Sequence, residues 1–477
     1  MKSWIRRAAP PSNLLHRLFA ICALIPLAYL PSMTLRAQNH ETQTERFRDD
    51  LNDGLRQVLN SKQFSACVTD LATGKEIFSV RPHAALKPAS VLKIPTSIAA
   101  FEKLGVNYRF KTEVRSERGS GGEVIYIKGG GDPSLTTEQL WAIARKLKMT
   151  VVKDVKRMIL DSSSFSDVRG AEGHRAYQTG SSALSFNHNS MAVTVCSAAP
   201  GKAAYVNVDP WESGIQVRGT VTTSAKGSTD IQVAGAQGGS FRVQGKIRAG
   251  SGCETFYRSV SNPEDVLGHV LAKFLQYLGI AGPQIKVTKG VAPSNSELLF
   301  SHDSPALSRI LQDLNQFSTN FIAEQIVFAL GRDDSSGTYS RDKGLRTMSE
   351  LLLSKGVKGD DFAFYDGSGL SHDNRITCSA LTRLLSYAYH SPFFGPEFKS
   401  SLSIVSQTGT LKKRGMGEPA GVIRAKTGTL NSVSTLAGYV ASADGKEYAF
   451  ALLNNAAGSP EAARKIEDDF VERLSKW

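Results

Sequence analysis

The sequence predicts an α+β fold: an antiparallel sheet flanked by helices, a helical subdomain, and a β-rich insertion in the middle of the chain. Three observations favour this fold. Strand-like runs joined by short turns lie near both ends, apolar residues at helical spacing follow the last run, and the middle contains short alternating runs broken by Gly and Ser. At 477 residues the chain is long enough for two or three domains.

Residues 1–37 have the pattern of a cleavable signal peptide. Basic residues precede an apolar run from Leu18 to Leu30, and Ala37 lies at a suitable cleavage position. The alternative is a retained membrane anchor, but the run is short and is broken by Pro26, so it is poorly suited to crossing a bilayer. We therefore expect export to the periplasm or another extracytoplasmic site, with the mature chain peripheral to a membrane at most.

Two strand hairpins are predicted, one near each end of the mature chain. Residues 64–70 and 76–80 flank the first turn, and residues 433–442 and 447–454 flank the second. Apolar residues at helical spacing then predict a final helix over residues 461–477. This helix has five acids and four bases, so we expect it to pack on the sheet rather than to bind a membrane.

The predicted insertion spans residues 106–292. Its alternating runs predict strands grouped in two subdomains, the inner one over about residues 197–260. Residues 38–105 and 293–477 are then expected to form one domain on either side of it.

The cysteines are suited to two different environments. Cys196 and Cys253 lie in the insertion, where they either pair in an oxidising compartment or remain two buried thiols. Cys67 falls in a predicted strand and Cys378 in a predicted helix, so both are expected to be packing residues. No cluster of histidines and cysteines has the spacing of a metal site, and no metal is expected.

Ser90 and Lys93 are the first part of a candidate nucleophilic site. A serine hydroxyl needs a base within hydrogen-bond reach to act as a nucleophile near neutral pH. Residues three apart share one face of a helix, so a helical segment would place the Lys93 amine beside the Ser90 hydroxyl. Burial, and a second cation such as Lys426, would lower the pKa of Lys93 far enough for it to act as the base.

Ser318 and Asn320 supply a hydroxyl and an amide from a distant part of the chain. They lie between two runs with helical patterns, residues 307–317 and 321–330. The Ser318 hydroxyl can relay a proton towards a leaving amine. The Asn320 amide can hold Lys93 and bind a substrate amide.

The third segment, Lys426 to Gly428, has the pattern of an exposed strand edge. Lys426 and Thr427 offer a cation and a hydroxyl for a substrate carboxylate, and Gly428 leaves room where a ligand approaches the backbone. The amide N–H groups of Ser90 and Thr429 are candidate donors to an oxyanion.

Each of the three motifs is weak alone. An S-x-x-K pair is more often an exposed helical pair, S-x-N is commonly a loop or a helix cap, and K-T-G is commonly a turn. The ordered set is much more specific, and it favours a serine acyl-transfer site.

Together the motifs resemble those of the penicillin-recognising serine enzymes. From about residue 45 onwards, the chain is similar to the D-alanyl-D-alanine carboxypeptidase/endopeptidase family of low-molecular-mass penicillin-binding proteins (peptidase family S13, type-4 class C). The segments that carry the resemblance are Pro88–Lys93, Gly130–Leu135, Ser318–Glu324, Asp366–Ser371 and Ala425–Leu430.

The resemblance implies a serine β-lactamase/penicillin-binding transpeptidase-like domain that hydrolyses peptidoglycan stem peptides without a cofactor. Ser90 would attack the carbonyl between two D-alanines, or the carbonyl of a cross-link, and β-lactam antibiotics would acylate Ser90 covalently. Lys93 would be the base, while Ser318 and Lys426 would deliver a proton to the leaving amine. The separation of 225 positions between Lys93 and Ser318 (318 − 93) leaves room for an insertion that a simple β-lactamase lacks.

The sequence departs from the family pattern at two places. His372 follows the D-G-S-G-L-S loop, where members often have Arg, and residues 174–178 contain no acid where some members carry one. By resemblance, these positions read the two ends of the substrate side chain.

Two other functions are compatible with the sequence: a β-lactamase or esterase on the same scaffold, and a non-catalytic cell-wall-binding protein whose insertion does the work. Fast β-lactam turnover without release of D-alanine would favour the first. The complete set of candidate catalytic residues argues against the second.

The net charge bears on partners. The formal charge is +13, and positions 1–37 contain five basic residues and no acids, which leaves 13 − 5 = +8 for the mature chain. A basic surface suits polyanions such as cell-wall polymer, although it often serves solubility alone. No aromatic–basic stripe or known motif indicates a nucleic-acid partner.

Overall fold

The computed structural model describes residues 45–477, except 120–121, 169–172, 174, 238, 416–422 and 444. The predicted signal peptide, residues 1–37, lies outside the described residues. The chain divides into two compact units, residues 1–53 and 54–477. Residues 45–53 of the first unit are helical. The second unit contains the sheets and helices that position the candidate site.

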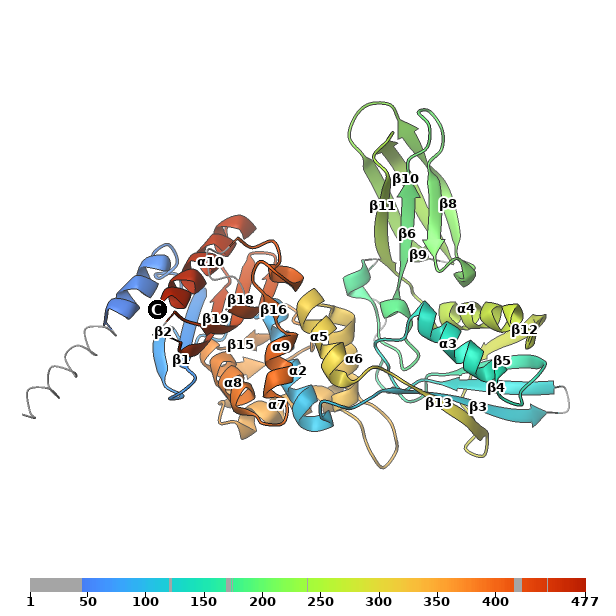
Figure 1. Cartoon of the computed structure of the whole chain (residues 1–477), viewed down its shortest axis with the longest axis horizontal. Coiled ribbons are helices and arrows are strands. Elements are labelled where there is room, and N and C mark those ends of the chain that lie inside the picture. The colour runs from blue at the N-terminus through green and yellow to red at the C-terminus, as the bar shows by residue number, and fades with distance from the viewer. Residues whose placement is uncertain are drawn as a thin grey trace, which may run out of the picture. The chain divides into compact units, whose positions relative to one another are not determined.

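The two ends of the second unit meet in one antiparallel sheet, with strand order β16-β17-β18-β19-β1-β2 (Figure 1). The strands are β1 (Phe64–Asp70), β2 (Glu76–Val80), β16 (Ser403–Ile404), β17 (Ile423–Leu430), β18 (Val433–Ala441) and β19 (Glu447–Asn454). The N-terminal and C-terminal hairpins join where β1 pairs with β19, from Phe64 opposite Asn454 to Asp70 opposite Tyr448. The predicted α+β fold is confirmed, and its sheet draws strands from both ends of the chain.

Helices cover both faces of this sheet, so β18 is buried along nearly all its length. Side chains alternate between the two faces of a strand. On one face, the Tyr439 hydroxyl donates a 2.7 Å hydrogen bond to the Leu385 carbonyl in α8 (Cys378–His390). On the other, Ser434 donates a 2.6 Å hydrogen bond to Glu467 in α10 (Pro460–Lys476). Figure 1 shows α8 and α10 on opposite sides of the sheet.

The helical subdomain is built around α2 (Lys93–Leu104), most of whose side chains are buried. Ile94 and Ile98 of α2 belong to one apolar core with residues of the surrounding helices. Those helices are α5 (Leu307–Phe317), α6 (Asn320–Leu330), α7 (Arg341–Ser354) and α9 (Gly395–Ser401). This packing holds the start of α2, where Lys93 lies, between the sheet and α6.

The inserted stretch contains a mixed sheet with strand order β12-β5-β4-β3-β13. The strands are β3 (Lys111–Gly119), β4 (Gly122–Lys128), β5 (Val155–Asp161), β12 (Ala281–Lys289) and β13 (Glu297–Asp303). The helices α3 (Thr137–Lys148) and α4 (Pro263–Tyr277) pack on it through an apolar core. The last strand falls after residue 292, and the domain boundaries given above stay a prediction.

Two small sheets form the inner part of the insertion, with strand orders β8-β10-β9 and β11-β6-β7. Their strands are β6 (Ser190–Cys196), β7 (Tyr205–Asp209), β8 (Gln216–Ser224), β9 (Asp230–Gln237), β10 (Ser240–Arg248) and β11 (Cys253–Ser259). Val193, Phe241 and Val243 lie in the core of this region. Cys196 and Cys253 are register partners in β6 and β11, and the structure joins them through a disulfide bond.

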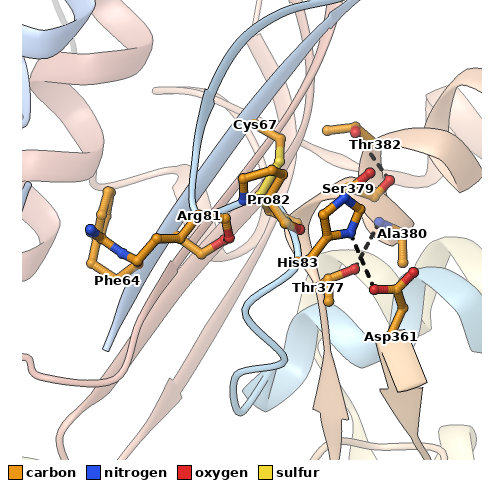
Figure 2. The surroundings of a disulfide bond; sticks show 12 residues. Phe64, Cys67, Arg81, Pro82, His83, Asp361, Thr377, Ser379, Ala380 and Thr382 are labelled. Atoms are coloured by element: carbon orange, nitrogen blue, oxygen red, sulfur yellow. Dashed lines mark hydrogen bonds and ion pairs between the residues drawn. A yellow bond between two sulfur atoms is a disulfide. The ribbon is translucent and has the colours of Figure 1, made fainter. Parts of the chain in front are cut away.

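A second disulfide corrects the expectation for the other two cysteines. Cys67 and Cys378 are bonded to each other across a sequence separation of 311 residues, rather than being two packing thiols. Figure 2 shows this bond beside Pro82 and Ser379. Cys67 lies in β1 and Cys378 begins α8, so the bond ties the sheet to the helix that covers it. Helical and strand patterns alone contain no information about which distant elements touch.

Among the described residues, no helix has both the length and the apolar character needed to span a membrane.

Candidate active site

Ser90 lies in a short 3-10 helix, Ala89–Leu92, that runs directly into α2 at Lys93. This continuous helical path places the two side chains on one face. The distance from Lys93 Nζ to Ser90 Oγ is 3.0 Å. Pro95 is the third residue of α2, where the absence of its N–H removes no intrahelical hydrogen bond.

Lys93 is fully buried and has three polar neighbours. Its Nζ donates to Asn320 Oδ1 at 2.8 Å and to the Ser368 carbonyl at 2.6 Å, besides contacting Ser90. A neutral amine has two N–H donors for those two acceptors and one lone pair, which is then available to take the Ser90 proton. The Ser90–Lys93–Asn320 arrangement therefore holds a base against the serine hydroxyl.

Burial lowers the pKa of Lys93 to about 7, because the charged ammonium loses its hydration. The carboxylates of Asp366 and Glu324 act in the opposite direction and keep the pKa from falling further. The sequence suggested that Lys426 would add to the effect on Lys93. In the structure the two buried lysines are close enough for mutual repulsion, and burial and the Lys93 charge lower the pKa of Lys426 well below its usual value.

Ser318 and Lys426 form a second pair beside the first. Ser318 links α5 and α6 in the left-handed region, with φ +59°, and this turn directs its hydroxyl to the sheet. Lys426 Nζ donates to Ser318 Oγ at 2.8 Å and to the Thr427 carbonyl at 2.8 Å. Lys426 is fully buried in β17. The pair can pass a proton to a group bound in front of it.

Gly428 lies where β17 passes the nucleophile. A Cβ at this position would lie 2.2 Å from Thr435 Oγ1, 2.8 Å from the Ser90 nitrogen and 2.9 Å from the Pro88 carbonyl oxygen. The sequence suggested that Gly428 makes room for a ligand; the structure shows that it makes room for the backbone of Ser90, the candidate nucleophile. Close packing here brings the Ser90 N–H next to β17, which also carries Thr429.

Thr427 has a partner that sequence analysis did not identify. Its hydroxyl donates a 2.8 Å hydrogen bond to Thr410 Oγ1, on a short 3-10 helix, Gly409–Leu411. The two hydroxyls lie together one residue along β17 from Lys426, whose Nζ donates to the Thr427 carbonyl. Only the fold brings residue 410 to this position.

The loop from Asp366 to Ser371 is held by its own carboxylate. Asp366 accepts backbone N–H bonds from Gly369 at 2.6 Å and Ser371 at 2.6 Å, and the Asn374 amide at 2.9 Å. Gly369 has φ +82°, and a Cβ there would lie 1.8 Å from the Ala89 carbonyl oxygen. The loop thereby presses against the nucleophile turn and presents the Ser368 carbonyl to Lys93.

Glu324 and Arg341 support this loop from below, and sequence analysis gave neither a role. Glu324 Oε1 accepts the N–H groups of Gly367 at 3.0 Å and Ser368 at 3.1 Å. Arg341 Nε lies 3.5 Å from Glu324 Oε2. Burial and the nearby Asp366 raise the pKa of Glu324, while Arg341 opposes that rise. The sequence shows acidic and basic residues at many positions, so it could not indicate that Glu324 and Arg341 are partners.

Two cavities open at this site. One has a volume of about 900 Å³ and includes Ser90, Thr429 and His372 among its lining residues. The other, about 400 Å³, is lined by Asn320, Arg341 and His372 together with Tyr177 of the insertion. Asn320 Nδ2 donates to the Tyr177 carbonyl at 3.4 Å, so the insertion reaches the candidate catalytic residues. In the described part of the chain, no group of three or more His, Cys, Asp or Glu side chains could hold a metal ion.

The chain matches a family model and several known proteins over most of its length. The family is described as D-Ala-D-Ala carboxypeptidase 3 (S13), and the match covers residues 48–477. A D-alanyl-D-alanine carboxypeptidase of Actinomadura sp. is 31% identical over 95% of this chain and 89% of that protein. The D-alanyl-D-alanine carboxypeptidase DacB of Haemophilus influenzae is 25% identical over 76% of this chain and 79% of that one.

A solved structure shows the same fold. The crystal structure of penicillin-binding protein 4 from Haemophilus influenzae superposes with a TM-score of 0.77 and 23% identity, over 90% of this chain and 99% of that one. The chain therefore belongs to the S13 family of D-Ala-D-Ala carboxypeptidases and is a serine peptidase of that class.

Proposed function

We propose that this D,D-carboxypeptidase works through an acyl-enzyme on Ser90. Lys93 takes the proton of the Ser90 hydroxyl as the oxygen attacks the carbonyl between two D-alanines of a peptidoglycan stem peptide. The observation that carries the proposal is the 3.0 Å contact between Ser90 Oγ and a buried Lys93 whose pKa is lowered to about 7. A base with a pKa near the working pH is well matched to this step.

The oxyanion that forms in this attack is stabilised by backbone donors. The proposed donors are the N–H groups of Ser90 and Thr429. Gly428 allows β17 to pack closely against the turn that carries Ser90, since a Cβ at position 428 would lie 2.8 Å from the Ser90 nitrogen. Donors fixed in advance cost no reorganisation when the charge develops, and removal of one such donor typically slows a reaction by about 10²–10³-fold.

The leaving amine receives its proton from Ser318, which Lys426 supports at 2.8 Å. Thr427, which follows Lys426 in β17, and its partner Thr410 bind the carboxylate of the departing D-alanine. The proton that Lys93 took from Ser90 is passed on to Ser318 and replaces the one given to the amine, so Lys93 is neutral again. Lys93 then accepts a proton from the water that attacks the acyl-enzyme, and this proton returns to Ser90 Oγ as the acyl group leaves. If the leaving amine belongs to a second stem peptide instead of to free D-alanine, the same steps cleave a cross-link. The enzyme then acts as a D,D-endopeptidase.

A β-lactam antibiotic presents a reactive amide to the same serine. One solved relative, penicillin-binding protein 4 of Haemophilus influenzae, was determined in complex with a β-lactam. We propose that such compounds acylate Ser90 of this chain and leave it slowly.

The enzyme works outside the cytoplasm, after export by the segment 1–37. Two disulfides support this location, because such bonds persist in oxidising compartments. Its substrate is cell-wall peptide, and the catalytic domain is formed by residues 38–105 and 293–477 around an insertion at 106–292.

Release of D-alanine from a synthetic pentapeptide tests the proposal. The wild-type protein should release one D-alanine per peptide, and Ser90→Ala should release none. Rapid nitrocefin turnover with no D-alanine release would instead indicate a β-lactamase. Retention of Ser90→Ala on purified cell-wall sacculi, with no turnover by the wild type, would indicate a binding protein. Mass analysis of fragments from intact sacculi separates carboxypeptidase from endopeptidase activity.

A further inference from the structure

The larger cavity continues from the nucleophile to the C-terminal helix. It follows the end of β17, passes the turn into β18 and ends against α10. Residues that mark this path are Ser90, Leu370, Thr429, Asn431, Gly458 and Arg464. With a volume of about 900 Å³, it is large enough for several residues of an extended peptide.

The cavity lies on the acyl-donor side of the scissile bond. Among the described residues, those that line it include Thr429 and the turn that follows, but not Ser318, Lys426 or Thr427. These three residues serve the leaving amine in the proposed reaction. A peptide that pairs with β17 therefore sends its leaving end towards Lys426 and its donor end towards Arg464.

Arg464 is the one lining residue of this cavity, within the described chain, that carries a permanent charge. It is exposed, and in the described residues its side chain has no hydrogen bond or ion pair. Its electrostatic neighbour Asp468 is already bound by Arg414, whose Nη1 lies 3.0 Å from Asp468 Oδ1. The guanidinium is thus available to an acceptor that enters from the cavity.

We propose that Arg464 binds a carboxylate of the acyl donor, upstream of its D-Ala-D-Ala end, and so selects anionic stem peptides over amidated ones. The inference rests on the proposed function for the direction of the peptide. A guanidinium presents two parallel N–H groups to a carboxylate, and such charge-assisted pairs are stronger than neutral hydrogen bonds. The carboxamide of an otherwise identical peptide offers one neutral acceptor and no charge.

The test compares two pentapeptides that differ only in one upstream group, a free carboxylate or its carboxamide. Both are labelled at the N-terminus, and their binding to Ser90→Ala protein is measured by fluorescence anisotropy, so turnover is not required. The variants are Arg464→Ala and Arg464→Lys, each in the Ser90→Ala background. Lys465→Ala is the matched control, because Lys465 is the adjacent exposed cation on α10 and does not line the cavity.

With Arg464 present, the carboxylate peptide should bind about two- to fivefold more tightly than the carboxamide peptide, in keeping with an ion pair made by an exposed side chain. Arg464→Ala should bring this ratio close to one, Arg464→Lys should retain part of it, and Lys465→Ala should leave it unchanged. Added salt should reduce the ratio, since the Arg464 guanidinium is exposed. A ratio that Arg464→Ala does not change, or that is already one with Arg464 present, would overturn the inference.

The two proposals fail in different experiments. If the wild-type protein releases no D-alanine while the binding ratio depends on Arg464, the catalytic proposal is wrong and the binding site stands. If D-alanine is released but the ratio does not depend on Arg464, the reverse holds.

Discussion

Replacement of Gly428 by alanine should disable acylation while leaving most of the fold intact. The new Cβ would meet Thr435 Oγ1 at 2.2 Å, the Ser90 nitrogen at 2.8 Å and the Pro88 carbonyl oxygen at 2.9 Å. The last two are backbone atoms, so a rotamer change cannot relieve them. β17 and the nucleophile turn must instead move apart.

The magnitude follows from what that movement separates. The Ser90 and Thr429 N–H groups lie on the two segments, so their spacing at the oxyanion increases. A displacement of about 1 Å typically costs about 10² in rate, and loss of one oxyanion donor costs about 10²–10³. We therefore expect acylation to slow by about 100-fold. Overpacking of this kind usually lowers the free energy of unfolding by about 1–3 kcal/mol.

The assay is the second-order rate of Ser90 labelling by a fluorescent penicillin, together with a thermal unfolding curve. Gly282→Ala is the control, because a Cβ at Gly282 meets no atom within 4 Å. Adding Thr435→Ala to Gly428→Ala should not restore the rate, since the two backbone contacts remain. A Gly428→Ala protein that is labelled within about threefold of the wild-type rate would refute the reasoning, which requires a loss near 10².

Three further predictions concern the base, the leaving group and the disulfide. The pKa of Lys93 is lowered to about 7, and only the neutral amine accepts a proton. The acylation rate constant should therefore fall about tenfold per pH unit below pH 7 and level off above it. A flat profile between pH 5 and 8 would contradict this. Lys426→Met should slow hydrolysis of a D-alanyl amide at least about tenfold more than hydrolysis of the matching ester, because the leaving group of the ester needs less protonation. Equal losses in kcat/KM for the two substrates would argue against a role of Lys426 at the leaving amine. Exchange of both Cys67 and Cys378 for alanine should lower the free energy of unfolding by about 2–5 kcal/mol, because the disulfide closes a loop of 311 residues. Urea denaturation measures the change, and an unchanged midpoint would contradict the prediction.

The sequence predicted the catalytic sheet because its strands are local hairpins. Residues 64–80 and 433–454 each carry alternating or apolar runs around a short turn, and such patterns fix strand pairing nearby. The final helix was equally visible from its apolar spacing. The sequence did not specify which of these strands are neighbours; the structure pairs β1 with β19.

Contacts between distant segments could not be predicted in the same way. The bond between Cys67 and Cys378 joins elements that lack any shared local pattern, and residue type alone made both look like packing residues. Thr410 and Arg341 reach the site from a short 3-10 helix and from α7, whose sequences have no motif. Their positions depend on tertiary packing, and the periodic patterns of a single sequence report local structure only.

The motifs themselves placed Ser90, Lys93, Ser318, Asn320 and Lys426 in one site because chemistry restricts which residues can serve a serine nucleophile. The environment of Lys93 was only half anticipated. Burial was expected, but the opposing carboxylates of Asp366 and Glu324 were not. Together these effects leave the pKa of Lys93 about 7, where a base is useful.

The most direct test of the central claim is peptide mapping by mass spectrometry after incubation with penicillin. The acyl-enzyme mechanism predicts that the mass of one penicillin is added to the peptide that contains Ser90, and that the adduct is absent from Ser90→Ala. Correct folding of that variant is checked by its thermal unfolding curve. An adduct on another residue, or equal labelling of Ser90→Ala, would contradict the assignment of Ser90 as the nucleophile.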